Sequence, residues 1–114
     1  MTKHTEHDVI KLRIGDMLFT WDDEKERINI RKHGIDFSAA ARVFLDEDVL
    51  LEYNSIDEYT GEERWNAIGI FDAGILFVVY VERVTAGEDE DDIIRIISAR
   101  EATRREKMRY ANES

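Results

Sequence analysis

The pattern of apolar and polar residues changes along the chain from strand-like to helical and back to strand-like. Near the N-terminus, two apolar stretches at residues 9–14 and 17–21 flank Gly15-Asp16, a pair typical of a hairpin turn. They predict two short strands joined by a tight turn. The residues before Val9 are polar, and we interpret 1–8 as a flexible tail that precedes one domain over 9–114.

Two helices are predicted after the hairpin. The first is preceded by Asp22, has acidic residues at its start and basic ones at its end, and is followed by Gly34. That order complements a helix dipole and supplies a C-terminal cap. Asp36 can cap the second helix, which has apolar residues at the i, i+3, i+4 and i+7 spacing of one helix face, at Phe37, Ala40, Ala41 and Phe44. The two helices should cover one face of a sheet.

The second half of the chain predicts an antiparallel meander and a final helix. Its expected strands are residues 49–53, 64–71, 75–81 and 93–98, and the acidic run at 87–92 is expected to be a solvated loop. The last strand has isoleucines on both parities, as an interior strand has. Ser98 and Glu101 match the Ser-x-x-Glu capping box. This strand should therefore turn directly into a helix over 99–111, with Arg100 in its first turn.

This order of elements indicates an α+β fold with N-terminal strands, two helices, a meander of three to four strands and a C-terminal helix. The helix pair should cover one sheet face and leave the other partly open. By strand alternation, Arg64 shares a face with Asn66, and Arg83 lies beyond Val79 and Val81 on one parity. Whether both arginines point to the open face depends on the register of the strands.

Composition narrows the possible functions. The 114 residues carry a formal net charge of −10, which argues against nonspecific binding of nucleic acid by the whole surface. Any phosphate site must therefore be a local cationic pocket. The chain has no cysteine, which excludes disulfides and thiolate metal sites, and no segment typical of a signal peptide or a membrane span. We expect a cytoplasmic protein.

Several ordered motifs carry a resemblance to a known family. They are Phe19-x-Trp21-Asp22-x-x-Lys25-x-x-x-Asn29-x-x-Lys32-His33-Gly34-Ile35-x-Phe37, then Ala40, Val43-Phe44 and Asp46, then Gly61-Glu62-x-Arg64 with Gly69, Val79-x-x-Glu82-Arg83, and Arg95-Ile-Ile-Ser-Ala-Arg100 with Glu106 and Tyr110. This arrangement resembles the BrnT toxins and extends from about Phe19 to Tyr110. Two features depart from the family pattern: the strong acidity and the additional N-terminal strand.

The resemblance implies a RelE-like ribonuclease fold and the toxin half of a type II toxin–antitoxin pair. The implied partner is a BrnA-like antitoxin with a ribbon-helix-helix fold. The family's complex binds its own promoter through the antitoxin, so the toxin would contact DNA only indirectly. The resemblance implies an RNA substrate and metal-independent cleavage, and we expect neither a cofactor nor a membrane partner.

RNA cleavage without a metal needs a base for the 2′-OH proton, cations that stabilise the phosphorane, and an acid for the leaving oxygen. The candidates for catalysis are Arg64, Arg83, Arg100, Lys25 and His33. The candidates for RNA binding are Arg95 and Lys32. Each has an ordinary alternative: the arginines can form salt bridges, Lys25 can be a surface cation, and His33 can bond the last carbonyls of its helix.

Three functions of different classes remain open from the sequence. The chain can be an endoribonuclease toxin, a module that keeps the toxin fold and binds an antitoxin without catalysis, or a small-ligand binder that uses the open sheet face. The few apolar residues of the last helix also suggest that this helix, or the sheet beneath it, meets the antitoxin.

Overall fold

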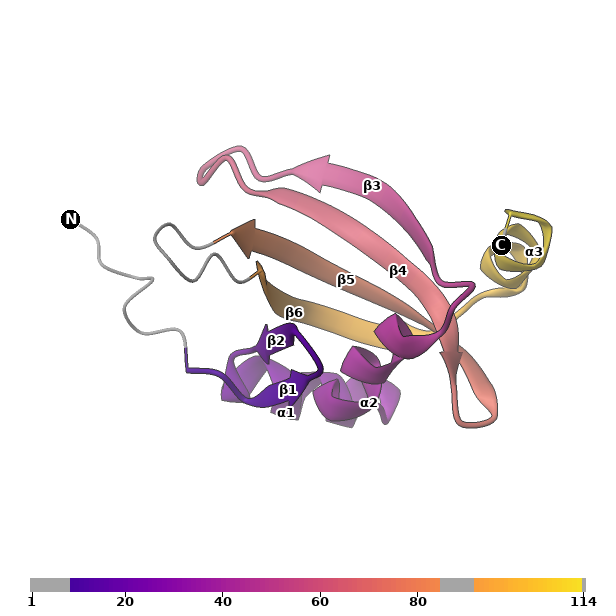
Figure 1. The fold of residues 1–114 in the computed structure, drawn as a ribbon, viewed down its shortest axis with the longest axis horizontal. Helices are drawn as coiled ribbons and strands as arrows, with labels where there is room; N and C mark the ends of the chain where they lie inside the picture. Colours follow the sequence, from indigo (N-terminus) through magenta and orange to yellow (C-terminus); the bar gives the residue numbers. More distant parts are fainter. Residues whose placement is uncertain (1–8, 85–91, 114) are drawn as a thin grey trace.

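The computed structural model describes residues 9–84 and 92–113, which form a six-stranded mixed sheet with three helices (Figure 1). The elements are β1 (Leu12–Ile14), β2 (Met17–Thr20), α1 (Asp23–His33), α2 (Phe37–Arg42), β3 (Leu50–Ile56), β4 (Glu63–Phe71), β5 (Gly74–Val84), β6 (Asp92–Glu101) and α3 (Arg104–Glu113). The predicted tail at 1–8 and the acidic run before Asp92 lie outside the described residues. None of the described helices is long and apolar enough to cross a membrane.

The sheet has the strand order β1-β2-β6-β5-β4-β3. The predicted hairpin is confirmed, since β1 and β2 pair through Ile14 and Met17 around Gly15, whose φ is 58°. The predicted meander is also confirmed, since β3, β4, β5 and β6 pair antiparallel in succession. β2 adds a parallel pairing with β6 that the meander alone did not predict. β6 is therefore an interior strand, paired on both sides at residues 93–95.

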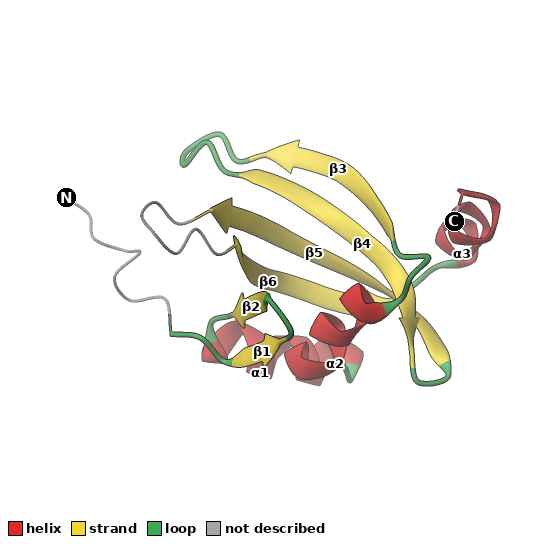
Figure 2. Cartoon of the chain, in the orientation of Figure 1, coloured by secondary structure: helices red, strands yellow, loops and turns green. Residues whose placement is uncertain are grey.

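Both predicted helix starts are confirmed by their caps. The Asp22 carboxylate accepts a hydrogen bond from the Lys25 backbone N–H at 3.0 Å, and Asp36 accepts one from Ala39 at 2.8 Å. Gly34 ends α1 in the left-handed conformation, with a φ of 72°, where a side chain would be strained. The apolar side of α2 is buried as the spacing predicted. Figure 2 shows both helices beside β6 and the β1–β2 hairpin.

Apolar side chains pack on both faces of the sheet. On the helix side, Phe19, Phe37 and Ile96 belong to the main core. On the opposite side, Ile68, Phe77 and Tyr110 form a smaller cluster under α3. Figure 1 shows α3 at one end of the sheet, so the rest of that face is not covered by a helix. The sheet thus has one face with two helices and one that is largely open, as the sequence indicated.

The predicted capping box at Ser98 and Glu101 is wrong. Both residues belong to β6, in which Ser98 pairs with Val79 and Glu101 with Leu76, so Arg100 lies on a strand and not in a helical turn. The helix begins later, at a second copy of the same pattern. Thr103 and Glu106 bond each other's backbone N–H groups at 3.2 and 2.8 Å.

Candidate functional site

The register of the strands places three arginines on the open face. Asn66 on β4 lies opposite Val79 on β5, so both residues point to the same side of the sheet. Arg64 and Arg83 follow at even spacing from them and share that side. Val81 is in turn the partner of Arg95 on β6. Arg64 and Arg95 thus lie two strands apart, about 10 Å between backbones, and Arg83 lies diagonally next to Arg95.

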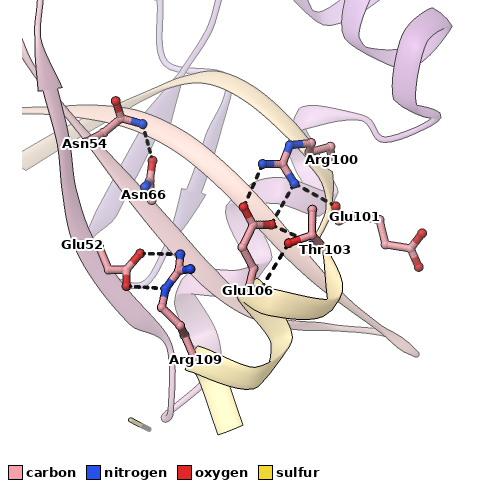
Figure 3. Close-up of polar contacts among 8 residues, drawn as sticks. All are labelled: Glu52, Asn54, Asn66, Arg100, Glu101, Thr103, Glu106 and Arg109. Carbon is pink, nitrogen blue, oxygen red and sulfur yellow. Dashed lines mark hydrogen bonds and ion pairs between the residues drawn. The ribbon is translucent and has the colours of Figure 1, made fainter. Parts of the chain in front are cut away.

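Arg100 lies on the same face but in a different place. The pairing of β5 with β6 shifts between Val79 and Tyr80, and this bulge puts Arg95 and Arg100 on one side despite their odd spacing. They are five positions apart along the strand, or roughly 16 Å. Arg100 donates to both carboxylate oxygens of Glu106 at 2.8 and 2.9 Å (Figure 3). Its guanidinium lies 4.3 Å from the centre of the Phe77 ring. These contacts tie α3 to the sheet.

A pocket of about 220 Å³ lies at the edge of β6 beyond its pairing with β2, where α1 meets the other end of the open face. Since a water molecule occupies about 30 Å³ in the liquid, this volume corresponds to roughly seven waters. Its lining residues are Asp22, Lys25, Arg64, Arg95, Ile96 and Ile97. Lys25 comes from the first turn of α1, and Asp22 is the cap of that helix. The pocket therefore combines side chains from α1, β4 and β6.

Asn29 holds α1 against the sheet at this pocket. β2 pairs with β6 only as far as Arg95, which leaves the next part of that strand edge without a neighbouring strand. The Asn29 side chain donates to the Ala99 carbonyl at 2.8 Å and accepts from the Ala99 N–H at 3.1 Å. It thus replaces the hydrogen bonds of a missing strand. This contact fixes the position of Lys25, one helical turn before Asn29.

The loop between β3 and β4 holds two of the arginines. Asp57 contacts Arg64 at 3.1 Å, and Glu62 contacts Arg95 at 2.7 Å. The Asp57 carboxylate also accepts the backbone N–H groups of Tyr59 and Thr60, and these bonds lower its pKa. Because a guanidinium has five N–H donors, one carboxylate leaves others for a phosphate. The loop therefore orients both arginines without using all their donors.

The electrostatics of the cluster favour an anionic ligand. Burial, and then the nearby charge of Arg95, lower the pKa of Arg83, as expected for two cations that face each other. The Nε of Arg64 is buried and has no hydrogen-bond partner among residues 9–84 and 92–113. A bound phosphate would reduce the repulsion between the arginines and supply additional acceptors.

Lys32 and His33 lie apart from this cluster. Both are exposed in the last turn of α1, about 10 to 12 Å along the helix axis from Lys25. His33 directly precedes Gly34, in the position where a cation favours the helix dipole. The structure therefore brings together Lys25, Arg64, Arg83 and Arg95, and places Lys32, His33 and Arg100 elsewhere.

Sequence reasoning missed the residues that position the cluster. Asp57 and Glu62 bind its arginines, Asn29 fixes α1, and Asp22 lines the pocket in addition to capping the helix. Asp22, Asn29 and Glu62 belong to the motifs that carry the family resemblance, so the sequence marked them as candidates. Their roles became clear only from the contacts in the fold. Within the described ranges, no three His, Cys, Asp or Glu side chains come together in an arrangement that could hold a metal ion.

A comparison with protein families agrees with this arrangement. A family model described as "Ribonuclease toxin, BrnT, of type II toxin-antitoxin system" matches residues 21–106, well over half of the chain. The matched range includes all four clustered cations and the loop that holds two of them. None of the curated proteins matches the chain.

Proposed function

Because the chain belongs to the BrnT family of ribonuclease toxins of type II toxin–antitoxin systems, we propose that it cleaves RNA at the pocket between Lys25, Arg64 and Arg95. An RNA substrate and an antitoxin partner follow from the family. The observation that supports this location is the meeting of three guanidinium groups and one ammonium group at one end of the open face. The chain has a net charge of −10, so a focused cationic site is what RNA binding requires.

The resemblance of the motifs supports a finer proposal for the partner. The antitoxin is BrnA-like, with a ribbon-helix-helix fold, and the complex reaches its promoter through that antitoxin. The site of action is the cytoplasm, where the toxin meets cellular RNA. In this arrangement the cationic face of the toxin is used for RNA and not for DNA.

The three arginines stabilise the charge that develops on phosphorus. When the 2′-oxygen attacks, the phosphodiester becomes a dianionic phosphorane, and each added charge needs a donor already in place. Arg64 and Arg95 are held by Asp57 and Glu62, so they lose little freedom when the phosphate binds. Arg83 adds a third positive charge beside Arg95. These groups supply the positive charge that a metal ion provides in other nucleases.

Two titratable groups in the pocket can carry the proton transfers. The hydrogen bond from the Lys25 backbone lowers the pKa of Asp22, so its carboxylate is ionised at neutral pH and can accept the 2′-OH proton. Lys25 can donate a proton to the 5′-oxygen as its bond to phosphorus breaks. The products are a 2′,3′-cyclic phosphate and a free 5′-hydroxyl, and solvent restores both side chains.

The test is cleavage of bulk RNA by the purified protein in EDTA, with Arg64→Ala and Arg83→Ala beside the wild type. Loss of one transition-state contact of this kind costs about 100- to 1000-fold in rate. A matched control is Arg109→Ala, because Arg109 carries the same charge on α3 and binds Glu52 at 3.0 Å (Figure 3). It should leave the rate unchanged.

Four outcomes separate the alternatives, once thermal melts show that each variant is folded. Intact RNA with wild-type protein that still binds its antitoxin would leave the non-catalytic binding module. Cleavage that needs a divalent metal would contradict the proposed charge stabilisation by arginine. Cleavage undiminished in both arginine variants would place the active site elsewhere. A chain that neither cleaves RNA nor binds an antitoxin would leave the third hypothesis, a small-ligand binder that uses the open sheet face.

A further inference from the structure

A second concave surface lies on the helix side of the sheet, opposite the cationic pocket. It is a groove of about 480 Å³ lined by Asp16, Met17, Phe44, Leu51, Tyr80, Glu82, Asp92 and Ile94. Five of these side chains are apolar or aromatic and three are acidic. Neither the arginines nor Lys25 line it.

The floor of this groove continues onto an exposed apolar strip of β3. Leu51 and Tyr53 are 49% and 52% exposed, and Tyr53 packs edge to face against Trp65. Figure 1 shows α1 and α2 near β6 and the β1–β2 hairpin, toward the edge of the sheet that is far from β3. These two helices therefore leave β3 uncovered on this face. Large apolar side chains gathered on one surface are typical of a binding site for another protein.

The acidic residues of the groove lack a matching cation among the described residues that line it. Glu82 lies opposite Ile94, two residues along from Asp92 on the same side of the sheet. Burial raises the pKa of Glu82, and so do a hydrogen bond and the charge of Asp92. Two carboxyl groups this close repel each other when both are ionised, and a partner cation would remove that repulsion.

Charge decides which macromolecule fits this surface. RNA is repelled by three carboxylates, and a second copy of the chain would bring another net charge of −10. A protein segment that combines apolar side chains with Lys or Arg matches both the apolar floor of the groove and its acidic rim, which Asp16, Glu82 and Asp92 form.

We propose that this groove binds a basic, amphipathic segment of the antitoxin. Apolar side chains of that segment pack on Leu51, Phe44 and Tyr80, and its cations meet Asp16, Glu82 and Asp92. The proposal rests on the antitoxin partner of the family and not on the assignment of the catalytic pocket. The antitoxin is then anchored on the face that RNA does not use.

The test measures binding of the antitoxin encoded beside this chain's gene to the wild type, Leu51→Glu and Glu82→Lys. Each variant should weaken binding at least about tenfold, mostly through faster dissociation for Leu51→Glu. Glu82→Lys should also make the association rate less dependent on salt concentration, because it reverses one of the acidic charges that attract the partner. RNA cleavage should stay at the wild-type rate in both.

Matched controls make the same chemical changes elsewhere. Ile70→Glu alters an exposed apolar residue of β4 on the opposite face, and Glu101→Lys reverses an exposed charge at the end of β6. Both should bind the antitoxin normally. Binding unchanged in both groove variants, or weakened equally by the controls, would overturn the proposal. So would loss of binding only in Arg64→Ala, which would place the antitoxin over the cationic pocket. A wild type that fails to cleave RNA but binds through the groove would contradict the proposed function and leave this inference standing.

Discussion

The two faces of strands β4 to β6 carry opposite chemistry within a few residues. Glu82 and Arg83 are neighbours in the chain, yet Glu82 lines the acidic groove and Arg83 joins the cationic cluster. Alternation along a strand makes this possible, since successive side chains point to opposite faces. The net charge of −10 is therefore a poor guide to the local field. One thin sheet can present an anion site on one face and a site for a basic partner on the other.

The faces also differ in how their charged groups are held. On the open face, Asp57 and Glu62 hold Arg64 and Arg95 at 3.1 and 2.7 Å, and Asn29 fixes the helix that carries Lys25. In the groove, Glu82 interacts with another acid, Asp92, which raises its pKa further after burial. A site for chemistry needs side chains oriented in advance, whereas a site for a protein partner can obtain its missing charges from that partner.

The largest expected effect is on the open face alone, from Asp22→Asn. Asparagine caps a helix as well as aspartate does, so α1 should remain intact while the proposed base is removed. General base catalysis typically contributes about 100- to 10,000-fold, and RNA cleavage should fall by that factor with antitoxin binding unchanged. Cleavage kinetics measure the loss of rate, and circular dichroism checks that α1 remains helical. Because the pKa of Asp22 lies below 3.8, the wild-type rate should lose this base only in more acidic solution.

A result that rejects this role is a normal rate in Asp22→Asn. Asp22→Ser is the control for capping, since serine also caps but offers no carboxylate. Equal losses in both variants with an unchanged melting temperature support the base. If the rate falls only in variants whose melting temperature also falls, Asp22 acts as a helix cap and not as the base.

Ile96→Ala should affect both faces through the stability of the strand that they share. Ile96 is 1% exposed on the interior strand β6, which carries Arg95 on one side and Ile94 of the groove on the other. Truncation of a fully buried isoleucine costs about 2 to 5 kcal/mol in the free energy of unfolding. Urea denaturation measures this change, and cleavage and antitoxin binding should fall in the same proportion as the folded fraction. A midpoint close to the wild-type value would place Ile96 outside the core.

Asn29→Ala should disturb the open face through its supporting helix. The substitution leaves the N–H and C=O of Ala99 without the two bonds they now make, and each unsatisfied buried group costs about 1 to 3 kcal/mol. Water that enters at this strand edge should reduce the total, so we expect about 1 to 3 kcal/mol overall. Cleavage should fall more than antitoxin binding, because Lys25 loses its fixed position. Hydrogen exchange at Ala99 should become faster, and unchanged protection there would contradict the role of Asn29.

Much of the fold could be predicted because its signals are local. Asp22, Asp36 and Gly34 mark helix ends by side-chain and backbone chemistry that needs no distant residue. The capping box is the instructive failure. Ser98-x-x-Glu101 and Thr103-x-x-Glu106 match the same pattern, and only pairing with β5 and with Asn29 decides that the first copy remains a strand. Long-range pairing of this kind is absent from any local pattern.

The site needed the register as well as the motifs. Alternation correctly put Arg64 with Asn66, but only the pairing of β4 with β5 shows that Arg83 shares their face. The bulge in β6 then reverses the parity rule between Arg95 and Arg100. The sequence could name the cations, while the separation of Arg100 from Arg95 depends on strand pairing. Glu62, which holds Arg95, lies 33 residues away from it in the chain, beyond any local signal.

The smallest expected effect, from Glu106→Gln, should leave both the cationic pocket and the acidic groove unchanged. The Glu106 carboxylate accepts hydrogen bonds from two nitrogens of the Arg100 guanidinium and from the Thr103 N–H (Figure 3). The hydrogen bonding by Arg100 is the main reason that the pKa of Glu106 lies below the ordinary 4.5. A lowered carboxyl pKa stabilises the fold above pH 4.5, and this contribution disappears as the pH falls through the folded-state pKa.

A charged hydrogen bond contributes about 1.5 to 3 kcal/mol. The side chain of Arg100 is 35% exposed, so solvent screening should reduce the effect to about 1 kcal/mol. Glu106→Gln should therefore be less stable than the wild type at pH 7 by that amount, and the gap should close at an acidic pH below the lowered pKa of Glu106. Urea denaturation at both pH values measures it, with cleavage and antitoxin binding at pH 7 as controls for the two faces. A gap of the same size at both pH values would show that the glutamine acts through packing of α3 and not through the charge of Glu106.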